Sequence, residues 1–140
     1  MINPKYLLYI SIFTLFLGLI PNHLAAQSDP MPDSKNYRVK LTDAGLEPKL
    51  LELRPDDSVV FFLNNTKDAL ASLEVNFKGK TMHCASSNMR VDNDEILRST
   101  SPFGPQDFAT TCFHSPGEYT YKVYGLPNNP QGISGRVVLK

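Results

Sequence analysis

Residues 113–125 read FHSPGEYTYKVYG, and this stretch decides the fold of the chain. The Pro116-Gly117 pair predicts a tight turn, because proline fixes φ and glycine tolerates conformations that other residues avoid. From Tyr119 onward every second residue is apolar, which is the period of a strand with one buried face. We therefore expect a β-hairpin that packs Tyr119 and Tyr121 against a core.

The pattern of this hairpin continues through most of the chain. Apolar residues recur at period two or in short blocks, and turn residues separate the blocks at regular intervals. The expected strands cover residues 37–41, 49–53, 58–63, 73–77, 107–113, 118–124 and 133–139. About seven short strands with little helical periodicity predict an all-β sandwich.

Two regions refine this prediction. Residues 58–63 are almost entirely apolar on both faces, as expected of a central strand, and we place Phe61 in or near the core together with Val75 and Phe113. Residues 81–105, in contrast, are polar and weakly patterned. We expect them to form a long irregular loop, which in a compact domain is a common place for function.

The N-terminal 26 residues resemble a cleavable secretory signal peptide. Lys5 supplies one positive charge, residues 7–20 form an uncharged and mainly apolar run, and two alanines precede Gln27 at the expected cut. The run is shorter than the roughly 20 residues that a membrane span needs. We expect a periplasmic or secreted protein, which only an uncleaved signal at residues 1–26 would tie to a membrane.

Composition and charge bound the rest of the chain. We expect a flexible lead-in over residues 27–36 and one domain over residues 37–140, which is long enough for a modest core. The 14 basic and 14 acidic residues balance and no basic run occurs, so we expect no nucleic-acid partner. Both cysteines lie in the exported part, where an oxidising compartment favours disulfides.

Several motifs of the chain resemble those of the cupredoxins, the plastocyanin-like blue copper sandwiches. In that family a Phe precedes a Pro-Gly turn, Tyr-x-Tyr follows and a Gly begins the last strand, which is similar to residues 113–121 and 132–138 here. Residues 46–48 and 54–61 resemble the family's second and third strands. The resemblance spans nearly all of residues 37–140 and implies a Greek-key β-sandwich.

The usual copper ligands of the family are missing from the matching positions. The family uses a His on the loop after the third strand and then a Cys, a His and a Met around the closing hairpin. Here the first His position falls near Ser72, Val123 stands at the Cys position, and no His or Met follows. A blue-copper centre needs thiolate and imidazole ligands, so we expect Val123 to pack and residues 123–140 to supply no metal ligand.

The remaining His, Cys and Met residues of the domain form two clusters. Residues 82–84 read Met-His-Cys with a methionine five positions later, and residues 112–114 read Cys-Phe-His. Thiolate, thioether and imidazole are ligands that copper favours, and alternate residues of an extended segment share a face. If the clusters meet, they predict a copper site. Its candidate ligands are His83, Cys84, Met89, Cys112 and His114.

The competing interpretation is a structural disulfide between Cys84 and Cys112. It would close a loop of roughly thirty residues, which the chain-entropy model values at about 3–4 kcal/mol. An oxidised pair supplies no thiolate to copper, so the thiol state separates the two interpretations. Both require the two cysteines to be close, within about 7 Å between Cα atoms for a disulfide.

Enzyme chemistry has little support in the sequence. A Cys–His pair can act as nucleophile and base, but no orienting third group and no nucleophile elbow accompany it, so we expect no enzyme. Asp92, Asp94 and Glu95 lack the spaced oxygen ligands and the central Gly of a calcium loop.

Two functional hypotheses remain open. In the first, an exported cupredoxin-like protein binds copper at the non-standard Cys, His and Met site for copper carriage, tolerance or electron transfer, with a redox or copper-handling protein as partner. In the second, a metal-free cupredoxin-like module, held by its disulfide, acts as a binding or accessory domain.

Overall fold

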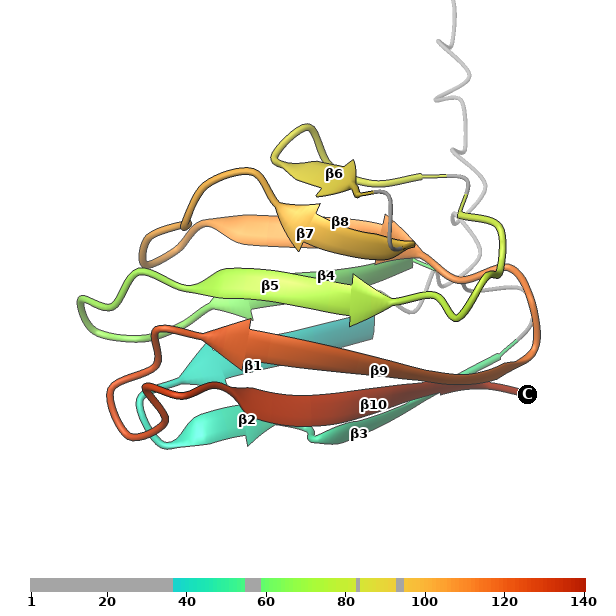
Figure 1. The fold of residues 1–140 in the computed structure, drawn as a ribbon. Helices are drawn as coiled ribbons and strands as arrows, with labels where there is room; N and C mark the ends of the chain where they lie inside the picture. The colour runs from blue at the N-terminus through green and yellow to red at the C-terminus, as the bar shows by residue number, and fades with distance from the viewer. Residues whose placement is uncertain (1–36, 55–58, 83, 93–94) are drawn as a thin grey trace, which may run out of the picture. The chain divides into compact units, whose positions relative to one another are not determined.

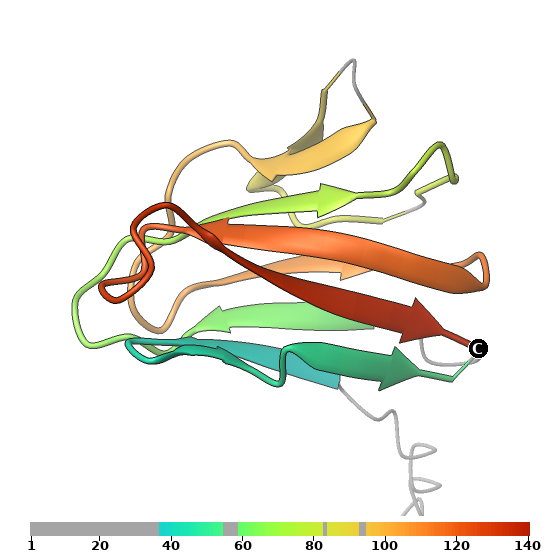
Figure 2. The same cartoon turned by 60° about the horizontal axis from the view of Figure 1, so that its bottom comes forward.

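The alternating apolar residues place the strands of the chain in two facing sheets (Figure 1 and Figure 2). A computed structural model describes residues 37–54, 59–82, 84–92 and 95–140. The expected signal peptide and lead-in, residues 1–26 and 27–36, lie outside the described residues, and so does His83. Within the described ranges, no helix is long and apolar enough to cross a membrane.

One sheet has four strands in the order β2-β1-β4-β8. Its strands are β1 (Tyr37–Thr42), β2 (Gly45–Glu47), β4 (Val59–Asn64) and β8 (Phe108–Cys112). β1 and β4 run parallel, whereas the other neighbours are antiparallel. This sheet carries the expected apolar strand, β4, between β1 and β8.

The other sheet has six strands in the order β3-β10-β9-β5-β7-β6. Its strands are β3 (Leu50–Leu53), β5 (Ser72–Asn76), β6 (Met89–Val91), β7 (Ile96–Ser99), β9 (Gly117–Tyr124) and β10 (Ile133–Leu139). β9 pairs with β10 in an antiparallel arrangement, and β3 joins β10 in parallel. The expectation of a hairpin at Pro116-Gly117 was wrong, because this turn leads from β8 in the four-stranded sheet to β9 in the six-stranded sheet. The chain also passes from one sheet to the other between β2 and β3.

The core lies between the sheets and is dominated by aromatic side chains. Val75, Phe113, Tyr119 and Tyr121 are buried, as predicted. Phe113 packs edge-on against Tyr119 with ring centroids 4.8 Å apart, and Tyr121 packs in the same way against Phe62 at 5.0 Å. Burying one large apolar side chain stabilises a fold by roughly 1.5–3 kcal/mol.

Tyr121 explains the glycine in the last strand. Tyr121 and Gly135 are register partners, and a Cβ at Gly135 would overlap the end of the Tyr121 ring. The Tyr121 hydroxyl donates a hydrogen bond to the Pro48 carbonyl at 3.2 Å. Burial raises the pKa of this phenol, which keeps the hydroxyl protonated as a donor.

The described residues form ten strands rather than about seven, and the additional ones are β2, β6 and β7. The prediction of an irregular loop over residues 81–105 was therefore wrong for β6 and β7, which pair with each other and continue the sheet beyond β5. Both are at most four residues long, so their apolar alternation is too short to stand out. An ion pair of Arg98 with Glu74 joins this hairpin to β5, and a second ion pair of Arg98 with Asp92 lies within the hairpin.

Phe61 departs from its predicted place in the core. Alternate residues of β4 are buried, and Phe61 lies on the other face of the strand, where it is half-buried. Its ring centroid is 5.8 Å from that of Phe108 on the outer face of the four-stranded sheet. One face of a sandwich sheet meets the core, so an apolar strand such as β4 presents its remaining residues to the outside.

Candidate functional site

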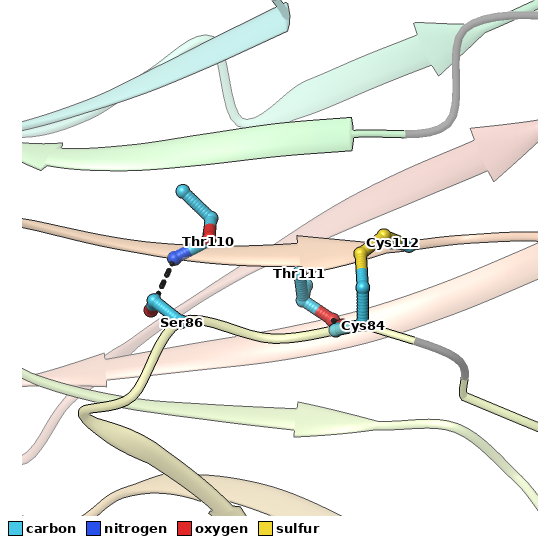
Figure 3. The surroundings of a disulfide bond; sticks show 5 residues. All are labelled: Cys84, Ser86, Thr110, Thr111 and Cys112. Carbon is cyan, nitrogen blue, oxygen red and sulfur yellow. Dashed lines mark hydrogen bonds between the residues drawn. A yellow bond between two sulfur atoms is a disulfide. The ribbon is translucent and has the colours of Figure 1, made fainter.

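Cys84 and Cys112 are joined by a disulfide bond at one edge of the four-stranded sheet (Figure 3). Cys112 ends β8, and its Cα lies 5.3 Å from that of Cys84. Ala85 forms an antiparallel bridge with Thr111, which places the two cysteines opposite each other. The sequence left two uses of this pair open, and the structure has the disulfide. Residues 84–86 are named the edge segment below.

Hydrogen bonds hold the edge segment along β8. The Cys112 N–H donates to the Cys84 carbonyl at 3.2 Å, and the Thr111 hydroxyl donates to the same oxygen at 3.3 Å. The Ser86 N–H donates to the Thr110 carbonyl at 3.0 Å, and the Thr110 N–H donates to the Ser86 hydroxyl at 2.9 Å (Figure 3). The edge segment therefore extends the four-stranded sheet past β8, and the disulfide closes this edge covalently.

The two cysteines differ in exposure. Cys112 is 4% exposed, whereas Cys84 lies on the surface. Phe113, the residue after Cys112, is fully buried and stacks on Phe77 with 5.5 Å between ring centroids. His114, one position further, is exposed. The disulfide thus links a surface segment to a strand end that is anchored in the aromatic core.

Met89, a predicted copper ligand, is part of the hydrophobic core. Met89 is buried at the start of β6. The side chain of the preceding residue, Asn88, donates to the Phe108 carbonyl at 3.1 Å. The Met89 N–H donates to the Ser86 carbonyl at 2.9 Å, so β6 begins next to the edge segment. The Met89 side chain belongs to the hydrophobic core.

The described residues supply no complete ligand set for copper. Cys84 and Cys112 are bonded to each other, and Met82 packs partly buried against the core. Within the described ranges, no three side chains of His, Cys, Asp or Glu are grouped so that they could hold a metal ion. Of the predicted ligands, His114 is exposed two residues after Cys112, while His83 lies outside the described part of the chain.

The strands of the sandwich run between two ends at which the loops lie (Figure 1). β9 runs from one end to the other, from Gly117 to Tyr124, a span of roughly 23 Å. The disulfide lies at the end where β9 begins, which we name the cysteine end. The loops that follow β4, β7 and β9 gather at the other end. We name it the ligand-position end, because the resemblance to cupredoxins places the copper ligands there.

Apolar packing fills the ligand-position end. Val123 is fully buried and packs in the core, as predicted. Ala71, next to the half-buried Ser72, exchanges two backbone hydrogen bonds with the buried Phe103, at 3.0 and 2.8 Å. Gly125 approaches the Leu70 carbonyl so closely that any side chain there would collide with it. Alkyl and hydroxyl groups are not the ligands that copper favours, so these residues do not fit a blue-copper centre.

A buried asparagine joins the loops of the ligand-position end. Asn64 is fully buried at the end of β4. Its amide nitrogen donates to the carbonyls of Ala69 and Phe103 at 2.9 Å each, and its oxygen accepts from the N–H and hydroxyl of Thr66 at 3.1 and 2.7 Å. The amide therefore uses its full hydrogen-bonding capacity. From the sequence, Asn64 is expected to belong to a turn. Its role in joining the two loops becomes visible only from its burial in the structure.

Lys80 and Tyr119 fix the β8–β9 turn at the cysteine end. The Lys80 ammonium donates to the Pro116 carbonyl at 2.5 Å and lies 4.9 Å from the centroid of the Tyr119 ring. The Tyr119 hydroxyl donates to the Ser115 carbonyl at 2.5 Å. Burial raises the pKa of Tyr119, so the phenol stays a donor at neutral pH.

Sequence reasoning missed an apolar groove on the outer face of the four-stranded sheet. The groove has a volume of about 260 Å³ and is lined by Arg38, Phe61, Leu63 and Phe108. Arg38 is opposite Phe61, and Leu63 is opposite Phe108, so three neighbouring strands build it. The sequence of β4 contains the evidence for this groove. Residues 59–63 are all apolar, so the strand presents apolar side chains to both faces of its sheet.

No family model matches the chain, and a search of curated proteins finds no match. Among solved structures, dithionite-reduced auracyanin from Roseiflexus castenholzii has a TM-score of 0.51 at 13% identity, over 75% of this chain and 96% of that chain. A reduced copper(I) form of an amicyanin variant has a TM-score of 0.49 at 16% identity, over 79% of this chain and 86% of that chain. The similarity to auracyanin, a cupredoxin, shows that the chain has a cupredoxin-like fold.

Proposed function

We propose that this chain is an exported, metal-free cupredoxin-like binding module that its disulfide stabilises. The disulfide carries the proposal, because both cysteines of the sequence are bonded to each other and leave no thiolate for copper. The ligand-position end supports it as well. Ser72 and Val123 stand there in place of a cupredoxin's first His and its Cys.

The signal-like N-terminal sequence and the disulfide both point to an oxidising compartment outside the cytosol. Residues 1–26 have the pattern of a secretory signal, and disulfides persist in oxidising compartments but are rare in the cytosol. We therefore place the mature protein in the periplasm or outside the cell. The intact mass of the exported protein should correspond to a chain that begins at Gln27 or within two residues of it. A mass that includes residues 1–26 contradicts this placement.

The proposed role is binding rather than catalysis. A catalytic site needs a nucleophile or base beside a pocket for substrate. Here the two sulfurs are bonded to each other, and the hydroxyls of Tyr119 and Tyr121 are engaged with backbone carbonyls. The groove over β4 is mainly apolar and suits recognition of another molecule.

Thiol titration and metal analysis of the exported protein test the metal-free state. The protein should be purified from its own compartment without chelators, and half of it denatured in the presence of a thiol reagent. We expect no reactive thiol and no stoichiometric copper, and we expect added copper to leave the unfolding temperature unchanged. Two thiols together with one copper ion per chain would refute the proposal.

Copper(I) binding by the reduced protein is a second candidate function. The Cα atoms of Cys84 and Cys112 lie 5.3 Å apart, so opening the disulfide would leave two thiols within reach of one ion. A dithiol partner would supply the two electrons and become a disulfide itself. Thiolates favour copper(I), and His114 would be a third ligand. The protein would then serve copper carriage, tolerance or electron transfer with a redox or copper-handling partner.

Copper(I) titration of the dithiol-reduced protein tests this second candidate. We expect the reduced wild type to bind one copper ion per chain. The His114→Ala variant should bind copper(I) at least tenfold more weakly, while its free energy of unfolding stays the same as that of the wild type. The Cys84→Ser/Cys112→Ser variant is the control and should bind no copper(I). Equal affinity of the wild type and the His114→Ala variant, or no binding by the reduced wild type, would rule this candidate out.

A further inference from the structure

The outer face of the four-stranded sheet carries an apolar stripe that no other described element covers. β4 contributes Val59, Phe61 and Leu63 to this face, and β8 contributes Phe108. Val59 is 40% exposed and Phe108 is 49% exposed. Single exposed apolar side chains are ordinary, whereas contiguous patches mark binding sites. The rings of Phe61 and Phe108 are 5.8 Å apart, so this patch is contiguous.

The size of the groove limits what it can bind. Its volume of about 260 Å³ lies below the roughly 300–1,000 Å³ of pockets that enclose a drug-sized ligand or cofactor. It lies on the flat face of a sheet rather than between layers, with Arg38, Phe61, Leu63 and Phe108 around it. Such a groove suits one or two side chains of a larger partner.

Basic side chains flank the groove on the β1 side. Arg38 and Lys40 are exposed and lie on the same face as Phe61. Neither side chain forms an ion pair with another described residue. Glu47, opposite Lys40 in β2, is the acidic strand residue of this face. A partner with carboxylates beside its apolar contact would therefore complement the charge of the face.

The disulfide borders the same face. Cys112 is the register partner of Val59, so it lies on the outer side of the sheet at the end of the apolar stripe. Phe108 lies at the other end of the same strand, β8. The bond to Cys84 holds the edge segment against β8 and thus stiffens the strand that carries Phe108, one of the four residues that line the groove.

We infer that this face docks a peptide segment of another protein, in which one large apolar side chain is flanked by carboxylates. The apolar side chain would enter the groove between Phe61 and Phe108, and the carboxylates would pair with Arg38 and Lys40. The inference rests on the proposed binding function and names its surface and the chemistry of its partner. A second copy of this chain is a poorer match, because it would need about 800 Å² from each partner and brings further basic charge.

Selection of a random peptide library on phage against the whole exported protein tests this inference. We expect the enriched peptides to centre on Phe, Leu or another large apolar residue with Asp or Glu on either side. A synthetic version of the most enriched peptide should bind at least tenfold more weakly to Phe108→Ser and to Arg38→Glu. The matched control is Leu70→Ser, because Leu70 is 61% exposed at the ligand-position end and should not affect binding. Thermal melts followed by circular dichroism check that each variant is folded.

Several results would overturn the inference. These are the absence of enriched peptides, enrichment of basic peptides, or equal loss of binding in Leu70→Ser and Phe108→Ser. A wild-type dimer that Phe108→Ser converts to a monomer in sedimentation experiments would assign the face to a second copy. Tenfold tighter peptide binding by the Asp29→Asn/Asp33→Asn variant would assign it to the chain's own lead-in. Thiol and metal content of the same preparation decides the proposed function separately, so a metal-free protein that enriches no peptide refutes the docking face alone.

Discussion

The two ends of the sandwich hold their loops together by different interactions. At the ligand-position end, the loops after β4 and β7 are joined by the fully bonded amide of Asn64, and Val123 packs beneath them. At the cysteine end, a covalent bond holds the edge segment, and Lys80 holds the β8–β9 turn. The difference indicates that a cupredoxin-like sandwich can order its ligand-position loops with hydrogen bonds and apolar packing instead of metal coordination.

The two ends should also respond to different conditions. The cysteine end depends on the oxidation state of Cys84 and Cys112, whereas the ligand-position end depends on keeping the Asn64 amide dry and fully bonded. A buried polar group contributes little net stability when it is satisfied, but it is costly when a partner is removed. Substitutions at each end can therefore separate the two modes of stabilisation.

The largest effect should come from removing the disulfide. The Cys84→Ser/Cys112→Ser variant should lose about 3–4 kcal/mol of unfolding free energy, because the unfolded chain regains the freedom of a long closed loop. Urea denaturation measures this loss, and the wild type reduced with a dithiol should lose a similar amount. A loss below about 1 kcal/mol would mean that the covalent bond is not what holds the cysteine end.

A smaller loss should follow from breaking the other end. Asn64→Ala removes four buried hydrogen bonds and leaves the Thr66 N–H without its acceptor, which should cost about 2–3 kcal/mol. The carbonyls of Ala69 and Phe103 each keep one donor, the Thr66 hydroxyl and the Ala71 N–H. Asn65→Ala is the matched control, since Asn65 is exposed and its loss should change stability by less than about 0.5 kcal/mol. If Asn64→Ala and Asn65→Ala are equally stable, the Asn64 amide is not what holds the loops of the ligand-position end together.

Alkaline pH should weaken the core that joins the two ends. Burial raises the pKa of Tyr121 above its ordinary value of 10.0, so the unfolded chain releases this proton first as the pH rises. The stabilisation is complete below pH 10 and declines as the pH rises above it, by roughly 1 kcal/mol at pH 11. Urea denaturation at pH 8 and pH 11 should show a smaller decline for Tyr121→Phe than for the wild type. An identical decline in both would place the alkaline sensitivity elsewhere.

The smallest effect concerns the cation at the cysteine end. Lys80→Met keeps the alkyl chain but removes the charge over the Tyr119 ring and the hydrogen bond to Pro116. We expect a loss of about 0.5–1 kcal/mol, typical of a cation–π contact near the surface. Lys67→Met, at an exposed position of the other end, is the control. If Lys80→Met and Lys67→Met are equally stable, the Lys80 contacts do not stabilise the cysteine end, and the disulfide is its main stabilising feature.

Much of the fold could be predicted from the sequence. The alternation through Tyr119 and Tyr121 identifies β9, because a strand with one buried face must alternate. The Pro116-Gly117 turn was correctly predicted as a turn but not as a hairpin, since β8 and β9 belong to different sheets. β6 and β7 escaped prediction, because three or four residues carry too little pattern. Phe61 was misplaced because hydrophobicity alone does not say which face of an apolar strand meets the core.

The candidate site was harder to predict than the fold. Two cysteines 28 residues apart fit both a disulfide and a copper site, because both require proximity. Their register opposite each other on β8 and the edge segment is a long-range pairing that no local pattern encodes. The groove shows the same limit, since Arg38, Phe61 and Phe108 come from three strands that only the sheet brings together.

The edge segment has a consequence for solubility. An uncovered strand at the border of a sheet offers its free N–H and C=O groups as a template on which another chain can assemble. The edge segment occupies those groups on β8 from Thr110 to Cys112, and the bond between Cys84 and Cys112 keeps it there. The disulfide therefore also protects this edge of the sheet from pairing with another chain.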